Sequence, residues 1–68
     1  METARVYTNY NMFTIDVARI GAYVAEMRNQ KGFTDTDYCE DIEVDSRGRI
    51  SALINGRGEY VATIDYDN

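Results

Sequence analysis

One helical stripe of apolar residues, in a chain that otherwise alternates in polarity, most constrains how this sequence can fold. The apolar residues recur at spacings of three and four, as on one side of an α-helix: Val17, Ile20, Val24 and Met27. We expect the helix to run from Asp16 or Val17 to Lys31. Asp16 suits the N-cap, with Thr14 as the alternative, and Gly32 suits a left-handed stop.

Two positions in or after this helix predict specific packing. Gly21 costs the helix roughly 1 kcal/mol relative to alanine, so we expect it to mark close packing against a strand. Phe33, directly after Gly32, is placed to fold back onto Met27. Both contacts would tie the helix to the rest of the protein.

Four segments outside the helix have strand-like patterns, in which side chains of one kind occupy every second position. The segments are ARVYTNY (4–10), DIEVD (41–45), RISALIN (49–55) and EYVATIDYD (59–67). Asn9 and Asn11 predict that the first segment ends in a turn near there. Asn55-Gly56 predicts a hairpin, and Gly48 and Gly58 can supply positive φ in the turns.

Together these patterns predict an α+β protein, a single small domain over residues 1–68 with the element order β-α-β-β-β. One helix would pack on one face of an antiparallel sheet and leave the other face for solvent or a partner. A chain of 68 residues buries about 60% of its unfolded surface, so its core is marginal. Because Cys39 is the sole cysteine, no disulfide within the chain can add stability, and self-association is an open alternative.

The composition disfavours most catalytic and metal-dependent functions. The chain has no histidine, so the common Ser-His and Cys-His pairs and ordinary zinc sites lack their ligands. Cys39 lies among acidic residues, which favours an inert, buried side chain over a nucleophile. We therefore expect a protein that is not an enzyme and that needs no cofactor.

The acidic run DTDYCEDIEVD does not fit a calcium-binding loop. Asp35 and Asp37 match the first and third ligands, but Cys39 stands at the fifth position and Glu40 replaces the turn glycine. Ser46 replaces the bidentate glutamate at the twelfth position. We expect no metal site in this run.

The net charge of −5 disfavours direct binding to DNA, RNA or anionic lipid and favours attraction to basic surfaces. The sequence has no run of 18 apolar residues and no apolar signal core, so we expect neither a membrane span nor export. A sole cysteine is typical of a reducing compartment, which makes the expected localisation cytoplasmic.

The acidic run shows a parity pattern that is typical of an extended strand. Five acids occupy odd positions, interrupted by Cys39: Asp35, Asp37, Asp41, Glu43 and Asp45. In an extended segment alternate side chains share a face about 6.7 Å apart, so Ile42 and Val44 would point inward under the helix. The acids would then form a ladder that could occupy a basic groove built for phosphates. The alternative is an ordinary solvated edge strand, kept from pairing by its charges.

Six tyrosines are many for this length, and tyrosine is enriched at interfaces because it offers a large contact area at low entropic cost. If the acids are merely solvated, we expect Tyr60 and Tyr7 to pack under the helix. If they bind a partner, some of the other tyrosines would flank them. The candidate partner-binding residues are Asp35, Asp37, Tyr38, Glu40, Asp41, Glu43, Asp45, Tyr10 and Tyr66.

These features resemble the small acidic inhibitors that phages make against host nucleases, including anti-CRISPR and DNA-mimic proteins. The resemblance is one of type: a short acidic chain, one helix on a small sheet, and the segment DTDYCEDIEVD. It implies a stoichiometric inhibitor that meets the basic surface of a nuclease or CRISPR effector complex in the cytoplasm of an infected bacterial host.

Two alternatives to this interpretation stay open. One is a homodimer or other homo-oligomeric accessory protein, in which the open sheet face and the surplus tyrosines form the interface. The other is an antitoxin or immunity-type protein that neutralises a toxic nuclease. Neither alternative requires the protein to bind nucleic acid or a membrane itself.

Overall fold

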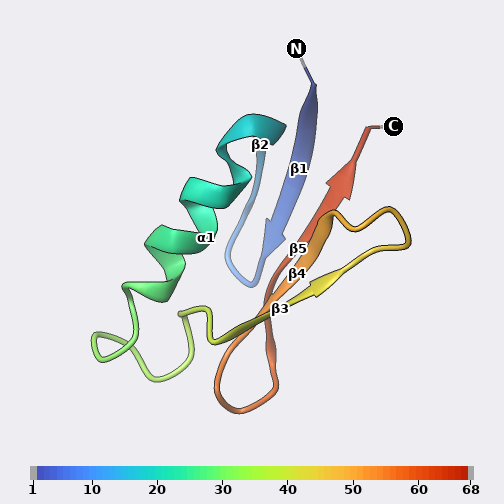
Figure 1. The fold of residues 1–68 in the computed structure, drawn as a ribbon. Helices are drawn as coiled ribbons and strands as arrows, with labels where there is room; N and C mark the ends of the chain where they lie inside the picture. Colours follow the sequence, from blue (N-terminus) through green and yellow to red (C-terminus); the bar gives the residue numbers. More distant parts are fainter. Residues whose placement is uncertain (1, 68) are drawn as a thin grey trace.

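Five antiparallel strands form one sheet in the computed structural model, which describes residues 2–67 (Figure 1). The strands are β1 (Thr3–Thr8), β2 (Met12–Asp16), β3 (Asp41–Val44), β4 (Ile50–Ile54) and β5 (Tyr60–Tyr66). Their order across the sheet is β2-β1-β5-β4-β3, so β2 and β3 form its edges. The last strand in sequence therefore lies at the centre of the sheet, between β1 and β4.

The helix follows β2 in the chain and packs on one face of the sheet. It begins with a turn of 3-10 helix, η1 (Val17–Arg19), and continues as α1 (Ile20–Arg28). Asp16 stands at the expected boundary with an extended backbone, but its carboxylate makes no capping hydrogen bond. After α1 the amides of Gln30 and Lys31 bond to carbonyls three residues back, so the chain continues in tight turns. The α-helix is therefore shorter than predicted.

The helix-facing side of the sheet carries the hydrophobic core. Its buried side chains come from β1, α1, β4 and β5: Ala4, Val6, Ile20, Val24, Leu53, Val61, Ala62 and Ile64. Cys39 joins this core, and its thiol donates to the Asp41 carbonyl oxygen at 3.3 Å. Burial raises the pKa of the Cys39 thiol. The prediction that this cysteine is a buried side chain is confirmed.

The strand β2 is missing from the sequence prediction, which passes from a turn directly to the helix. Met12–Asp16 is too short to show strand periodicity between a turn and a helix start. Its extended state comes from pairing with β1, where Val6 lies opposite Phe13 and Ala4 lies opposite Ile15. The α+β class with a helix on an antiparallel sheet is confirmed. Within residues 2–67 the order is β-β-α-β-β-β instead of β-α-β-β-β.

Two predictions about helix packing are wrong. A methyl group at Gly21 would meet nothing within 4 Å, because this glycine lies on the exposed side of α1. Phe33 is 83% exposed and does not fold onto Met27. Cys39 closes this end of the core instead, and its amide donates to the Met27 carbonyl at 3.1 Å.

Both hairpin loops of the β3–β4–β5 meander form where the sequence predicts them. Gly48 and Gly58 each have a φ of 78°, in the left-handed region that glycine favours. Gly56 has a different role, because its amide donates to the Tyr38 hydroxyl at 3.0 Å. A side chain at Gly56 would clash with that hydroxyl.

Candidate tyrosine–carboxylate surface

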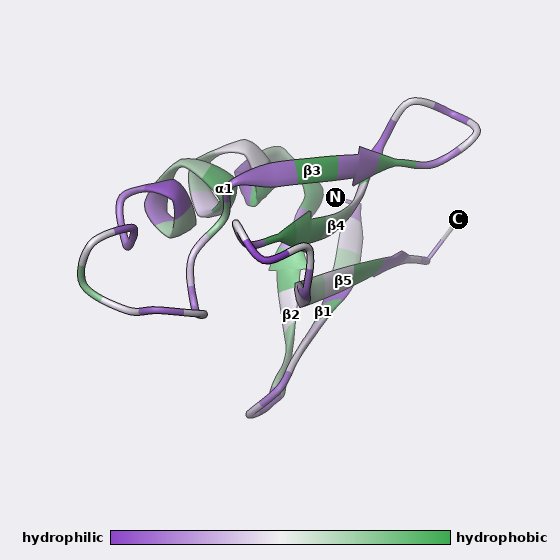
Figure 2. Cartoon of the chain, turned by 90° about the horizontal axis from the view of Figure 1, so that it is seen from below, coloured by the Kyte–Doolittle hydropathy of each residue, from purple (hydrophilic) through white to green (hydrophobic). Residues whose placement is uncertain are grey.

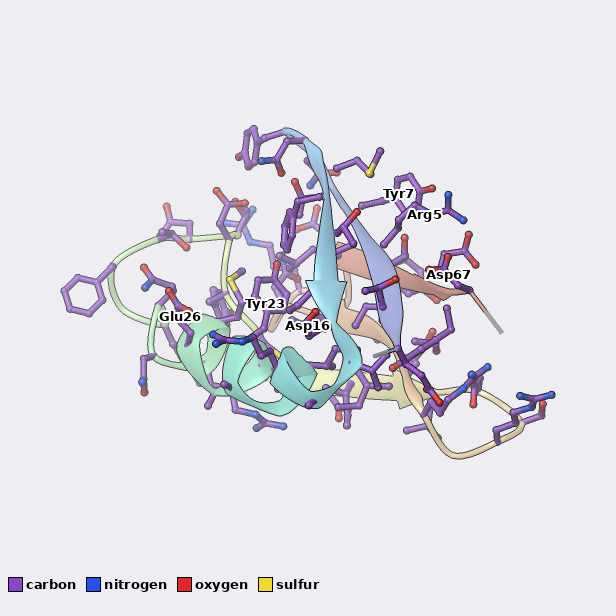
Figure 3. All side chains as sticks on the ribbon, turned by 90° about the horizontal axis from the view of Figure 1, so that it is seen from above. Arg5, Tyr7, Asp16, Tyr23, Glu26 and Asp67 are labelled. Carbon is purple, nitrogen blue, oxygen red and sulfur yellow. The ribbon has the colours of Figure 1, made fainter. Side chains whose placement is uncertain are left out.

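The face of the sheet opposite α1 is open. Figure 3 shows Arg5 and Tyr7 on this side, whereas Tyr23 and Glu26 lie on the helix side. Residues that pair across neighbouring strands lie on the same face of the sheet. On the open face these residues are Tyr7, Thr63, Ala52 and Glu43. Glu43 on the edge strand β3 therefore points away from the helix, as the parity pattern predicts.

The five-acid ladder is shorter than the sequence predicts. Asp41 and Glu43 lie on β3 and share the open face. Asp35 and Asp37 lie outside the strand, since residues 35–38 form bends instead of an extended segment. The parity pattern therefore holds over β3 and fails before it, because parity orders side chains only where the backbone is extended.

Of the two β3 residues predicted to point inward, one does so and the other does not. Ile42 packs against the core. Figure 2 shows β3 with a hydrophobic segment between hydrophilic ones. Val44 is exposed, which contradicts the prediction that it is buried. A register shift between Glu43 and Val44 interrupts the pairing of β3 with β4 at that point.

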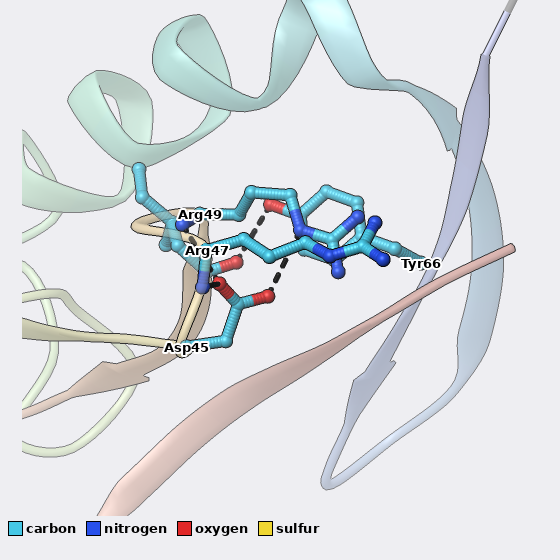
Figure 4. Close-up of polar contacts among 5 residues, drawn as sticks. Asp45, Arg47, Arg49 and Tyr66 are labelled. Carbon is cyan, nitrogen blue, oxygen red and sulfur yellow. Dashed lines mark hydrogen bonds and ion pairs between the residues drawn. The ribbon is translucent and has the colours of Figure 1, made fainter. Parts of the chain in front are cut away.

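Asp45 belongs to the β3–β4 hairpin loop and not to the ladder (Figure 4). Its Oδ1 accepts hydrogen bonds from the amides of Arg47 and Arg49 at 2.8 and 2.9 Å. Its Oδ2 accepts one from Nε of Arg49 at 2.9 Å. These bonds, above all the one from the Arg49 amide, lower the pKa of Asp45. The charge of Asp45 is thus balanced within the chain.

Two other acids of the run, Glu40 and Asp35, are in different surroundings. Glu40 accepts a hydrogen bond from Nζ of Lys31 at 2.6 Å, and this contact raises the pKa of Lys31. Asp35 is exposed on the loop that precedes β3. Neither residue lines the recess described below.

Tyr60 lies on the open face and contacts the acidic strand. Its hydroxyl donates to Oε1 of Glu43 at 2.9 Å, and its side chain is exposed. The hydrogen bond to Glu43 and the charge of Glu43 raise the pKa of Tyr60. Tyr7 is also exposed on this face, so the expectation that these two tyrosines pack under the helix is wrong.

A second tyrosine–carboxylate pair joins two distant segments. Tyr10, in the turn between β1 and β2, donates its hydroxyl proton to Oδ2 of Asp37 at 2.9 Å. This hydrogen bond raises the pKa of Tyr10. Tyr10 is 76% exposed, so its ring remains available for contact.

An open recess of about 340 Å³ lies beside the Tyr10–Asp37 pair and Tyr60. It is lined by Asn9, Tyr10, Thr36, Asp37, Asn55, Glu59 and Tyr60. Asn55 is buried, and its Nδ2 donates to the Thr36 carbonyl at 3.0 Å and to Oε1 of Glu59 at 3.1 Å. We define the tyrosine–carboxylate surface as Tyr10, Asp37, Asp41, Glu43, Glu59 and Tyr60.

The four carboxylates of this surface belong to Asp37, Asp41, Glu43 and Glu59. None of them forms an ion pair with another part of residues 2–67. Three of them accept a hydrogen bond from a neutral side chain, which orients the carboxylate without neutralising it. Such groups can accept strong, charge-assisted hydrogen bonds from arginine or lysine.

Two predicted contact tyrosines have structural roles instead. The Tyr38 hydroxyl accepts the Gly56 amide proton and so links the loop before β3 to the β4–β5 hairpin. The Tyr66 hydroxyl donates to the Ile50 carbonyl at 2.7 Å, and the Arg49 guanidinium lies 4.3 Å from the centre of its ring. Both side chains are partly buried and lie outside the tyrosine–carboxylate surface.

The sequence prediction omits Glu59 and places Tyr60 under the helix. Strand parity alone places Tyr60 on the core side with Ala62 and Ile64, and the register shift between Leu53 and Ile54 turns it to the open face. The recess itself has no local signal, since it joins the β1–β2 turn, the loop before β3 and the β4–β5 hairpin. Within residues 2–67, no three acidic or cysteine side chains gather closely enough to hold a metal ion.

Comparison of the chain with protein-family models, curated proteins and solved structures finds no match. Among the described residues, no helix is both long and apolar enough to span a membrane.

Proposed function

We propose that this protein is a non-catalytic inhibitor that binds the basic, nucleic-acid-binding surface of a nuclease or CRISPR effector. One observation carries the proposal: in residues 2–67, four carboxylates without a cationic partner share a surface with two exposed tyrosines. Two of these carboxylates, Asp37 and Glu59, line one recess together with both tyrosines. A basic partner would supply the missing cations. Charge complementarity of this kind speeds association and selects among partners.

The tyrosines support binding to a protein surface. Tyr10 and Tyr60 are each exposed, and each is held in place by its own hydrogen bond to a carboxylate. A tyrosine that is already oriented loses little entropy when it becomes buried in an interface. We propose that both rings contact the partner while the carboxylates face its arginines and lysines.

The inhibitor would act in the cytoplasm of an infected bacterial cell. An antitoxin or immunity-type protein would use the same surface against a different nuclease, because the physical requirement is the same basic groove. The experiment below therefore identifies the partner as well as the surface.

The test compares Glu43→Lys with Glu26→Lys, which change the net charge equally. Glu26 is exposed on α1, on the helix side of the sheet. Each immobilised protein is used to capture partners from a bacterial lysate along a salt gradient, and captured nucleases are then assayed for DNA cleavage with added inhibitor. Asp45 is not used, because its carboxylate holds the β3–β4 hairpin loop.

We expect Glu43→Lys to weaken partner binding about tenfold or more, equivalent to about 1.4 kcal/mol, and to relieve inhibition. Glu26→Lys should behave as the wild type. Equal losses in both variants would show that net charge acts without a defined surface, and unchanged binding by Glu43→Lys would refute the proposal.

A further inference from the structure

The two edges of the sheet differ in how they are protected from pairing with another strand. The β3 edge carries Asp41 and Glu43 and has a register shift next to Glu43. In addition, the Ile42 amide donates to Oδ1 of Asp41 at 2.8 Å, so this main-chain donor is already engaged. Charges, irregular pairing and blocked donors are the usual ways in which edge strands avoid association.

The β2 edge has less of this protection. Its sequence, MFTID, pairs with β1 in continuous register from Asp16 to Met12. Asp16 is its one charged residue and lies at its end, 4.0 Å from Nε of Arg19. Met12 and Thr14 are exposed. A regular, nearly uncharged edge strand can accept another strand.

Hydrogen-bond alternation identifies which main-chain groups of β2 face outward. The Thr8 amide donates to the Asn11 carbonyl and the Val17 amide to the Glu2 carbonyl, which sets the bonded pairs between β1 and β2. Because bonded pairs in antiparallel strands recur at every second residue, Phe13 and Ile15 bond to β1. The N–H and C=O groups of Met12 and Thr14 and the N–H of Asp16 therefore point to the free edge. The Asp16 carbonyl is already used, because it begins the 3-10 turn at Val17–Arg19.

We propose that β2 pairs antiparallel with β2 of a second copy of this chain, around a two-fold axis at Thr14. In this register Thr14 lies opposite its counterpart and Met12 lies opposite Asp16 of the other copy. The two Thr14 residues then exchange two hydrogen bonds, and each Asp16 amide donates to a Met12 carbonyl, which gives about four main-chain hydrogen bonds. Other two-fold registers leave more of these groups unpaired, and a register centred on Asp16 would place like charges in contact.

The side chains suit this register. Threonine pairs directly across antiparallel strands are favourable. On the core side, Phe13 would lie opposite Ile15 of the second copy, which brings apolar side chains of both cores together. The proposed pairing thus adds apolar contact to the main-chain hydrogen bonds.

Charge placement also favours this edge over β3. Four strand spacings of about 4.8 Å separate β2 from β3, a distance of about 19 Å. This exceeds the Debye length of about 8 Å at physiological salt, so the acids on β3 are screened from the two-fold axis. The dimer would be one continuous sheet with a tyrosine–carboxylate surface toward each end, although its formation does not depend on the proposed function.

The test is sedimentation equilibrium of wild type, Thr14→Pro and Thr14→Val from about 10 μM to 1 mM, the range expected for a weak dimer. Proline at position 14 removes an outward N–H without breaking a bond to β1, which edge strands tolerate. Valine keeps this N–H and the β-branched shape. We expect wild type and Thr14→Val to dimerise. The dimer dissociation constant of Thr14→Pro should be at least tenfold higher than that of the wild type.

Amide hydrogen exchange of the wild type provides a test that does not depend on a variant folding. The amides of Thr14 and Asp16 should exchange more slowly in the concentrated sample than in the dilute one. Equal exchange at both concentrations, a wild type that is monomeric throughout, or a Thr14→Pro variant that dimerises normally would each overturn the proposal. A monomeric wild type would leave the edge to a strand from another protein.

Discussion

Asp45 and Asn55 occupy equivalent positions in the two hairpin loops of the meander. Oδ1 of Asp45 accepts the amide protons of residues 47 and 49, and Oδ1 of Asn55 accepts those of residues 57 and 59. In each loop the glycine three residues on donates its amide to the carbonyl of the first residue. The loops DSRGR and NGRGE therefore share one hydrogen-bonding design despite different sequences.

The two positions should respond differently to exchange of their side chains. Asp45→Asn keeps the Oδ1 acceptor and loses the charge that faces Arg49, so it should cost less stability than the change at position 55. Asn55→Asp also keeps it but loses the Nδ2 donor and places a second carboxylate beside Glu59. Because Asn55 is buried, we expect this change to cost roughly 2 kcal/mol or more. Urea denaturation monitored by circular dichroism measures both losses, and equal losses would contradict a separate role for the Asn55 Nδ2 donor.

Acidification should destabilise the wild type more than Asp45→Asn. The Arg49 and Arg47 hydrogen bonds lower the pKa of Asp45 below its usual value of 3.8. A lowered folded-state pKa gives a stabilisation that is present above the unfolded pKa and is lost as the pH falls through the folded one. The free energy of unfolding of the two proteins should therefore converge in acid. A constant difference between them down to the lowest pH would show that the Asp45 charge has no role.

Alkali should release the contact between Tyr60 and Glu43. The hydrogen bond to Glu43 raises the pKa of Tyr60 above its usual value of 10.0. A raised folded-state pKa gives a stabilisation that is complete below the unfolded pKa and is lost as the pH rises through the folded one. We expect Glu43→Gln to return one tyrosine to ionisation near its usual pH, measured by tyrosinate absorbance. Tyr60→Phe should remove the same late transition, and a titration unaltered in both variants would contradict the contact.

Alanine at Gly21 should stabilise the protein. The side chain would meet nothing within 4 Å, so the variant gains helix propensity of up to about 1 kcal/mol without strain. Gly58→Ala is the matched control, because its φ of 78° disfavours any other residue and should make the same change destabilising. Thermal unfolding measures both changes in stability: the midpoint should rise for Gly21→Ala and fall for Gly58→Ala. A less stable Gly21→Ala variant would mean that α1 packs at this position after all.

Local patterns identified those parts of the fold that depend on local physics. The helical stripe placed Ile20 and Val24 on the buried side of α1, and the glycine-rich segments placed both hairpins. The candidate surface was less predictable. Asp41 and Glu43 follow from strand parity, whereas Tyr10 meets Asp37 across 27 residues of sequence. No periodicity in a sequence reports a contact of that kind.

The sequence by itself determined the class of fold, the apolar side of the helix, the buried Cys39 and the outward direction of Asp41 and Glu43. Each of these follows from residue type and from the repeat of a helix or a strand. The tertiary structure decided the rest: that Met12–Asp16 is an edge strand, that Asp45 belongs to a loop, and that Tyr60 joins the open face. These outcomes depend on which strands become neighbours, because a short segment is held extended and a side chain is directed by its partner across the sheet.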